Sequence, residues 1–259
     1  MEFFKVDSEN GEYTSVDGVL FDKNITCLIA YPAGKKSVSY TVPESVKYIT
    51  DGAFSNNRYI ETVDFAKNVP EIGDGVFENC TKLKNIMLPL GLTEISDSMF
   101  KNCSALEHIN IPAGVASIGE SAFSNCVMLK EITLPMSLKI IDNLAFSGCT
   151  AIEQFTVPDG VSEIGYRAFS GCNALKEIQL SMLLKVIESY TFSYCKGLET
   201  VNIGKNLSVV NDSAFKGCAA LRTIDFNGTR GMWKNIEIKD DNNSFEEAVV
   251  SFIDDLDNN

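Results

Sequence analysis

The sequence predicts an elongated solenoid of stacked coils, because three residue columns recur every 23 positions without an insertion. The first column is phenylalanine, at Phe54, Phe77, Phe100, Phe123, Phe146, Phe169, Phe192 and Phe215. The second column follows three residues later and is cysteine from Cys80 to Cys218, with Asn57 in the first copy. The third is a pair of apolar positions two residues apart, such as Ile109 and Ile111. Most of the chain is therefore one structural unit, repeated.

The paired apolar positions predict one β-strand per repeat, since alternate side chains of a strand lie on the same face. A proline without an N–H group ends four of these strands, at Pro89, Pro112, Pro135 and Pro158. Segments such as "SDSMF" and "GESAF" before the phenylalanine predict a short 3₁₀ or helical turn. We therefore expect a right-handed superhelix with a parallel sheet on the concave side and short strands and turns on the convex side.

The repeats are expected to form an array of about eight coils over residues 39–226. A single repeat cannot bury a core of its own, so the stacked array is the folding unit. Residues 1–38 are expected to contain a capping β-hairpin, with strands at 19–21 and 27–31.

The end of the chain leaves the repeat register at residue 227. Residues 227–259 are expected to form a C-terminal cap, in which Trp233 covers the last coil. The acidic tail "DDLDNN", residues 254–259, is expected to be disordered.

Composition excludes several classes of partner. A net charge of -13 and a pI near 4.6 argue against binding to nucleic acid or to an anionic membrane surface. No apolar run approaches the roughly 18 residues that a membrane span needs, so no membrane insertion is expected. The first residues lack the features of a secretory signal. A monomer is expected.

The eight cysteines raise the question of disulfides or metal. The sequence has no Cys-x-x-Cys and a single histidine, His108, which disfavours zinc. Cysteines in adjacent coils would lie about 4.8 Å apart, within disulfide range, but their side chains all point inward. Free buried thiols are the favoured interpretation, and disulfides or a metal are the alternatives. We expect no cofactor and no catalytic site, since no constellation of acid, base and nucleophile emerges.

The repeated pattern "IG-x-x-AF-x-x-C-x-x-L-x-x-I-x-LP", the segment "VDGVLFDKNITCLIAYPAGK" and the segment "NGTRGMWKNI" resemble the BspA-like, treponemal-type leucine-rich repeat family. The resemblance implies a leucine-rich repeat solenoid on the surface of host-associated bacteria, where the family is linked with adhesion to host proteins. It therefore implies a non-catalytic, adhesin-like protein at the cell surface or secreted, with a protein or glycoprotein as partner. The alternative is an intracellular scaffold for protein–protein interaction built on the same repeat.

Two surfaces are candidate partner-binding sites. The concave stripe consists of outward-facing strand residues: Asn85, Met87, His108, Asn110, Glu131, Thr133, Gln154, Thr156, Glu177 and Gln179. The turn-side patch is an aromatic group outside the core columns: Tyr166, Arg167, Tyr190 and Tyr194. A further column alternates in charge from coil to coil, so each inner charge is expected to face two opposite charges: Glu61, Lys84, Glu107, Lys130, Glu153, Lys176, Glu199 and Arg222.

Overall fold

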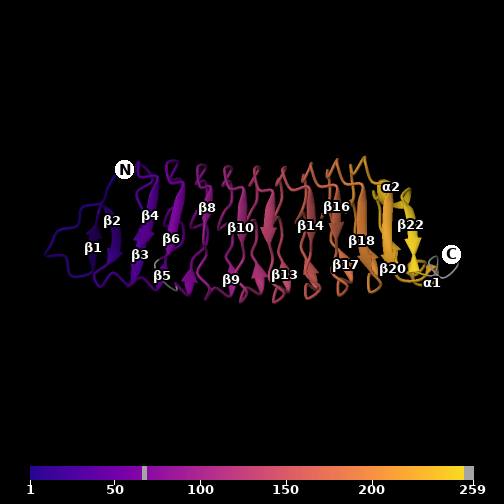
Figure 1. Cartoon of the computed structure of the whole chain (residues 1–259), viewed down its shortest axis with the longest axis horizontal. Helices are drawn as coiled ribbons and strands as arrows, with labels where there is room; N and C mark the ends of the chain where they lie inside the picture. The colour runs from indigo at the N-terminus through magenta and orange to yellow at the C-terminus, as the bar shows by residue number, and fades with distance from the viewer. Residues whose placement is uncertain (66–68, 254–259) are drawn as a thin grey trace.

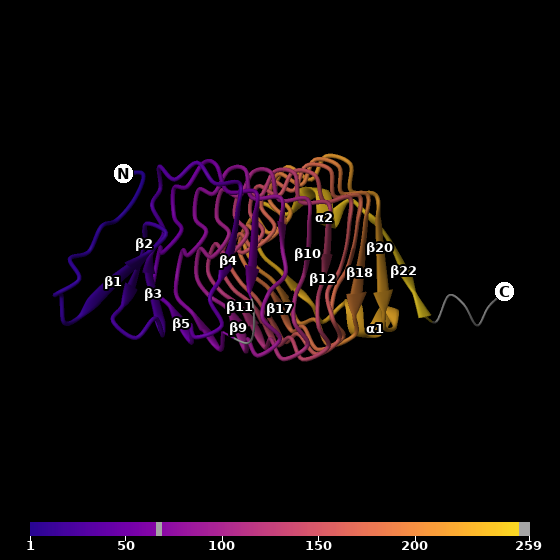
Figure 2. The same ribbon diagram turned by 60° about the vertical axis from the view of Figure 1, so that its left-hand side comes forward.

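The computed structural model describes residues 1–65 and 69–253. Within these residues the chain forms a parallel β-solenoid of about ten turns, stacked in a single row with the two termini at opposite ends (Figures 1 and 2). Each coil contributes one strand to each of two rows of parallel strands, which we call ladders, and each row is divided into three hydrogen-bonded sheets. The 23-residue repeat and the leucine-rich repeat solenoid expected from the sequence are confirmed.

The long-strand ladder carries the paired apolar columns. Parallel neighbours lie one repeat apart, as in the pairing of Ile109 with Ile132. Its strands are β4 (Ser39–Val42), β6 (Thr62–Phe65), β8 (Asn85–Ile86), β10 (His108–Asn110), β12 (Glu131–Thr133), β14 (Gln154–Thr156), β16 (Glu177–Gln179), β18 (Thr200–Gly204), β20 (Thr223–Asn227) and β22 (Val249–Phe252). Because β22 continues the pairing beyond β20, the C-terminal segment adds one more coil to the array.

The short-strand ladder forms the opposite side of each coil. Its outward residue alternates with a buried isoleucine or valine, such as Ile118 or Ile141. Its strands are β3 (Cys27–Ala30), β5 (Tyr48–Ile49), β7 (Glu71–Ile72), β9 (Glu94–Ile95), β11 (Ser117–Ile118), β13 (Ile140–Ile141), β15 (Glu163–Ile164), β17 (Val186–Ile187), β19 (Val209–Val210) and β21 (Glu237–Ile238). The single apolar column before each phenylalanine is therefore enough to build a second parallel ladder.

Each coil then turns a corner through successive i→i+3 hydrogen bonds. In one coil the N–H groups of Ala122 and Ser124 donate to the carbonyls of Gly119 and Ser121, at 3.2 and 3.0 Å. Two residues per corner have a left-handed backbone, here Ser121 (φ 57°) and Asn125 (φ 59°). A helix cannot propagate through such residues, so these corners are chains of tight turns.

The core is a stack of phenylalanine rings, one from each coil. Adjacent rings have centroids 5.2 to 5.6 Å apart, and all eight side chains are fully buried. The stack continues into both ends of the molecule, where Tyr31 lies 4.8 Å from Phe54 and Phe245 lies 4.6 Å from Phe215. One continuous aromatic column therefore joins the array to its two caps.

The cysteine column supplies hydrogen-bond donors. Each of the seven thiols donates to the carbonyl of the phenylalanine 26 residues earlier, as Cys103 does to Phe77 at 3.1 Å. In the first copy the side-chain amide of Asn57 donates to the carbonyls of Pro32 and Lys35, at 2.9 and 3.2 Å. Cysteine and asparagine share this position because both can donate to a buried carbonyl oxygen.

The N-terminal cap is a three-stranded antiparallel unit. β1 (Tyr13–Val16) pairs with β2 (Val19–Asp22), and β2 pairs with β3. The other edge of β3 pairs in parallel with β5, the next strand of the short-strand ladder. The carboxylate of Asp22 fixes the turn by accepting from the N–H groups of Thr26 and Cys27, each at 2.6 Å. The sequence led us to expect only the two strands that correspond to β2 and β3, and the structure adds β1.

The C-terminal cap covers the last coil with two short helices, a buried asparagine and an aromatic ring. It contains α1 (Arg230–Trp233) and α2 (Asn243–Glu246). Asn242, fully buried, accepts from the N–H of Phe215 at 3.0 Å and donates to the carbonyl of Asn211 at 2.9 Å. Trp233 is only half-buried and packs against Phe226 and Phe245. The ring stacked on the array is thus Phe245; the acidic tail at 254–259 lies outside the described residues.

Candidate functional site

The concave stripe lies on the outer face of the long-strand ladder. β10 and β14 show the alternation of exposed, buried and exposed residues that places its members outward. Met87 follows β8 and has 80% of its surface exposed. A shallow hollow of about 280 Å³ lies over Asn85, Met87 and His108. The stripe is therefore accessible, polar and free of aromatic side chains.

Several members of the stripe already have partners, in the stripe or beside it. His108 Nδ1 lies 3.4 Å from Glu131 Oε2. The amide of Asn202 donates to Glu177 at 2.9 Å, and the amide of Gln179 donates to the carbonyl of Leu180 at 3.1 Å. These contacts order the side chains and occupy part of their hydrogen-bonding capacity.

The alternating charge column forms ion pairs between neighbouring coils. Lys84, Lys130 and Lys176 each contact the glutamate of the preceding coil, at 2.8, 3.7 and 2.7 Å. Hydrogen bonding to Lys176 lowers the pKa of Glu153, and Glu153 raises the pKa of Lys176. Among the described residues each of these lysines lies within 4.0 Å of one glutamate, and Glu199 of the next coil also contributes to the raised pKa of Lys176, which therefore faces two opposite charges.

The turn-side patch contains a preorganised cluster. The Arg167 guanidinium carbon lies 5.1 Å from the ring centre of Tyr166 and 5.0 Å from that of Tyr190. The two rings meet edge to face, 5.7 Å apart. We call these three residues the tyrosine–arginine cluster. Cation–π contacts of this kind fix an exposed arginine that would otherwise move freely.

The cluster is built on unfavourable backbone. Arg167 and Tyr190 occupy one left-handed corner position (φ 56° and 60°), at which five other coils have glycine or serine and one has a leucine, Leu144 (φ 57°). Each large side chain costs roughly 1–2 kcal/mol at such a backbone conformation. A strained exposed residue that a glycine could replace points to a role outside folding.

Tyr194 lies apart from the cluster. Its ring covers Gly217 of the next coil, where an added Cβ would meet the ring at 2.9 Å. It is half-exposed and also occupies a left-handed position (φ 59°). The structure thus brings together three of the four turn-side residues and places the fourth on a neighbouring surface.

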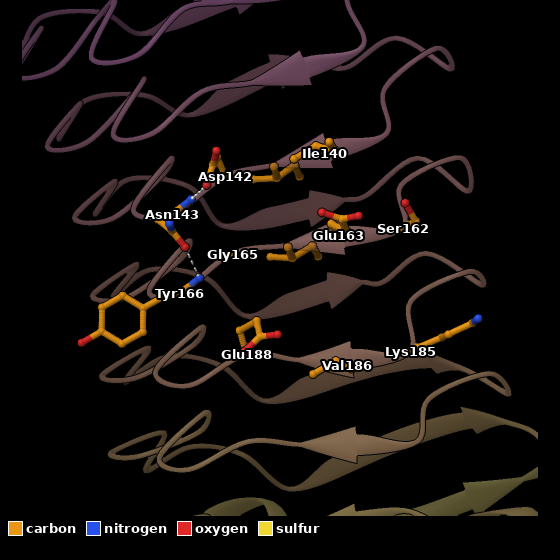
Figure 3. A pocket seen from close by; sticks show the side chains of 12 residues that line it. Ile140, Asp142, Asn143, Ser162, Glu163, Gly165, Tyr166, Lys185, Val186 and Glu188 are labelled. Carbon is orange, nitrogen blue, oxygen red and sulfur yellow. Dashed lines mark hydrogen bonds between the residues drawn. The ribbon is translucent and has the colours of Figure 1, made fainter.

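A groove of about 480 Å³ adjoins the cluster on the outer face of β13, β15 and β17. Figure 3 shows Tyr166 at the turn end of this groove and Lys185 at the other end, with Glu163 and Glu188 between them. The backbone N–H of Tyr166 donates to Asn143 Oδ1 at 2.8 Å, which ties two coils together at the turn end. We call this the convex groove.

The convex groove was missed by sequence reasoning. Its polar residues flank the buried column of Ile141 and Ile164, whereas outward-facing residues were predicted only for the strands that carry the paired apolar positions. Treating that column as a strand would have identified Glu163 and Val186 as outward-facing, because each directly precedes a buried isoleucine.

The seven thiols of the cysteine column are buried and not accessible for chemistry, whereas Cys27 is half-buried. Burial raises the pKa of Cys80 to about 12, and it raises the pKa of Cys103 and Cys126 well above the ordinary range. Within residues 1–65 and 69–253 no group of three histidine, cysteine or acidic residues is arranged to hold a metal ion. The described helices are short, and none combines the length and apolarity that a membrane crossing requires.

Comparison with known proteins agrees with this architecture. The model of the BspA type leucine rich repeat region matches residues 33–151 and 116–248, with six copies. No curated protein matches the chain.

Solved structures of two leucine-rich repeat proteins and of a vaccine antigen are similar to the chain. A protein from Bacteroides ovatus has a TM-score of 0.66 at 23% identity, over 95% of this chain and 71% of its own. A protein from Eubacterium ventriosum has a TM-score of 0.54 at 27% identity, over 65% of this chain and 52% of its own. The pneumococcal vaccine antigen PcpA has a TM-score of 0.49 at 21% identity, over 97% of this chain and 50% of its own. The chain thus spans about half the length of the last two proteins.

The repeat columns, the two parallel ladders and the match to the family model over most of the sequence lead to one assignment. The chain belongs to the BspA-type leucine-rich repeat family.

Proposed function

We propose that the protein is a non-catalytic, adhesin-like binding module, displayed at a bacterial cell surface or secreted, that recognises surface proteins or glycoproteins of a host. The observation that carries this proposal is the tyrosine–arginine cluster. Tyrosine and arginine are enriched among the residues that dominate the energetics of protein interfaces, and Arg167 contacts the exposed ring of Tyr166 and the half-buried ring of Tyr190 before any partner arrives. Strain at Arg167 and Tyr190 is the cost of presenting them.

The solenoid supports such a role because its surface is preformed. Binding to a rigid surface avoids the loss of loop and side-chain freedom that weakens many interfaces. The concave stripe offers polar contacts over several coils, which individually are weak and add through avidity. Together the two surfaces favour an extended partner over a small molecule.

The experiment measures binding of the purified chain to immobilised host matrix and mucosal proteins. Tyr190→Ser installs the residue that Ser98 and Ser213 supply at the same corner position, so the fold is preserved. Tyr13→Ala removes an exposed tyrosine from the N-terminal cap and is the matched control. We expect Tyr190→Ser to weaken binding at least tenfold and Tyr13→Ala to leave it unchanged. Equal binding by wild type and Tyr190→Ser would refute the role of the cluster.

A further inference from the structure

The convex groove has the size and the mixed chemistry of a ligand site. Its volume of about 480 Å³ falls within the range of small-molecule sites. It crosses three coils, and the half-buried side chains of Ile140 and Val186 contribute apolar surface. An oligosaccharide of two or three units would fit the length of three coils at about 4.8 Å per step.

The polar groups of the groove include both acceptors and donors. The side chains of Glu163 and Lys185 have no hydrogen bond or ion pair to any described residue, so both can bind a ligand. Asp142 accepts from the N–H of Asn143 at 2.6 Å, and Glu188 accepts from the amide of Asn211 at 2.9 Å, which orients both carboxylates. A ligand rich in hydroxyl groups, which both donate and accept, matches this set better than a purely anionic or purely cationic one.

The charge around the groove also favours a neutral ligand. Three carboxylates, from Asp142, Glu163 and Glu188, face the two cations Lys185 and Arg167. The remaining charge is a single negative one, which would repel a sialylated or sulfated ligand and gives little attraction for a polycation.

The exposed aromatic ring of Tyr166 is the fourth feature of the groove that bears on its ligand. Tyr166 is 39% exposed as a residue, and its ring contacts Arg167 and Tyr190 at the turn end of the groove (Figure 3). A rigid aromatic ring can stack on the apolar C–H face of a sugar while its neighbours bond the hydroxyls. The side chain of Arg167 makes no hydrogen bond or ion pair within the described residues, so its N–H groups remain available.

From these four features we infer that the convex groove and the tyrosine–arginine cluster bind a neutral oligosaccharide, carried by a glycoprotein. The inference deepens the proposed function, on which it rests, by naming the glycan as the part of the partner that is recognised. Tyr166 stacks on the sugar, Arg167 donates to its hydroxyls, and Glu163 accepts from them.

The test is a glycan array probed with the full chain. The array presents neutral galactose-, glucose-, mannose- and N-acetylglucosamine-terminated oligosaccharides beside sialylated and sulfated ones. Wild type is expected to bind neutral oligosaccharides, and Arg167→Gly and Tyr166→Ala are each expected to bind at least tenfold less. Arg167→Gly should melt no lower than wild type, because glycine relieves the left-handed strain. Ser98→Gly, at the same corner position three coils away, should bind as wild type does.

Three results would overturn the inference: no binding to any neutral oligosaccharide, a preference for sialylated or sulfated ones, or equal binding by wild type and Arg167→Gly. A parallel binding assay on an enzymatically deglycosylated host protein separates this inference from the proposed function. Binding that survives deglycosylation and still requires Tyr190 leaves the proposed function standing and refutes the glycan site. Loss of binding on deglycosylation supports both.

Discussion

Raising the pH is predicted to unfold the solenoid through its buried thiols. Burial raises the pKa of six of them: Cys80, Cys103, Cys126, Cys149, Cys195 and Cys218. A thiol in the unfolded chain titrates near pH 8.5, whereas the folded pKa of Cys80 is about 12. Because the folded pKa is the higher one, the stabilisation is fully present below about pH 8.5 and is lost as the pH rises toward the folded value.

The magnitude follows from proton linkage. Between the two pKa values each thiol lowers the free energy of unfolding by about 1.4 kcal/mol per pH unit. Six thiols acting together give roughly 8 kcal/mol per pH unit, which is comparable to the whole stability of a typical domain, about 5–15 kcal/mol. Tyr31 and Tyr40, whose pKa values burial also raises, act in the same direction only above about pH 10. Unfolding is therefore expected within one or two pH units above about pH 9.

The assay is the melting temperature by circular dichroism from about pH 7 to about pH 10, with a reductant present throughout. Cys126→Ala removes one titrating group and should flatten the pH dependence by about one sixth, although it lowers stability at neutral pH by removing the donor to the Phe100 carbonyl. A melting temperature that stays constant between about pH 8 and about pH 10 would refute the linkage argument.

Two other substitutions test the packing of the array. Lys176→Glu places a like charge beside Glu153, which should lower the melting temperature by roughly 2 °C at low salt and less at high salt; a shift that does not depend on salt would contradict this. Asn242→Ala leaves the N–H of Phe215 buried without an acceptor, which should cost about 2 kcal/mol and lower the melting temperature by roughly 4–8 °C. Asn243→Ala, at the exposed neighbouring position, is the control for the second change and should melt as wild type does.

Much of the fold could be predicted from the sequence because the same pattern recurs in every repeat, which decides between strand and helix where a single copy would not. A single apolar pair such as Ile86 and Leu88 fits a strand or a helix, but the same pair at eight positions 23 residues apart fits only a stacked strand. The inward column of Phe54 and its equivalents followed in the same way, since a large apolar side chain at a constant register must be core.

The caps and the candidate sites could not be predicted in the same way, because they occur once. Phe245 stands outside the 23-residue register, and only the three-dimensional path of α2 brings it onto Phe215. The contact of Arg167 with Tyr166 and Tyr190 depends on a left-handed backbone at Arg167 and Tyr190. Large residues such as arginine and tyrosine rarely adopt this conformation, so the residue types offered no reason to expect it. The donor role of the thiols was also hidden, because a small buried residue usually reads as a hydrophobe.

The most direct test of the proposed adhesin is protease shaving of intact source cells, followed by detection of released peptides from this protein. The account predicts peptides from the exposed corners, around Tyr166 and Tyr194, from intact cells as well as from lysates. Protection in intact cells, with cleavage only after lysis, would contradict a surface location and would favour the intracellular scaffold.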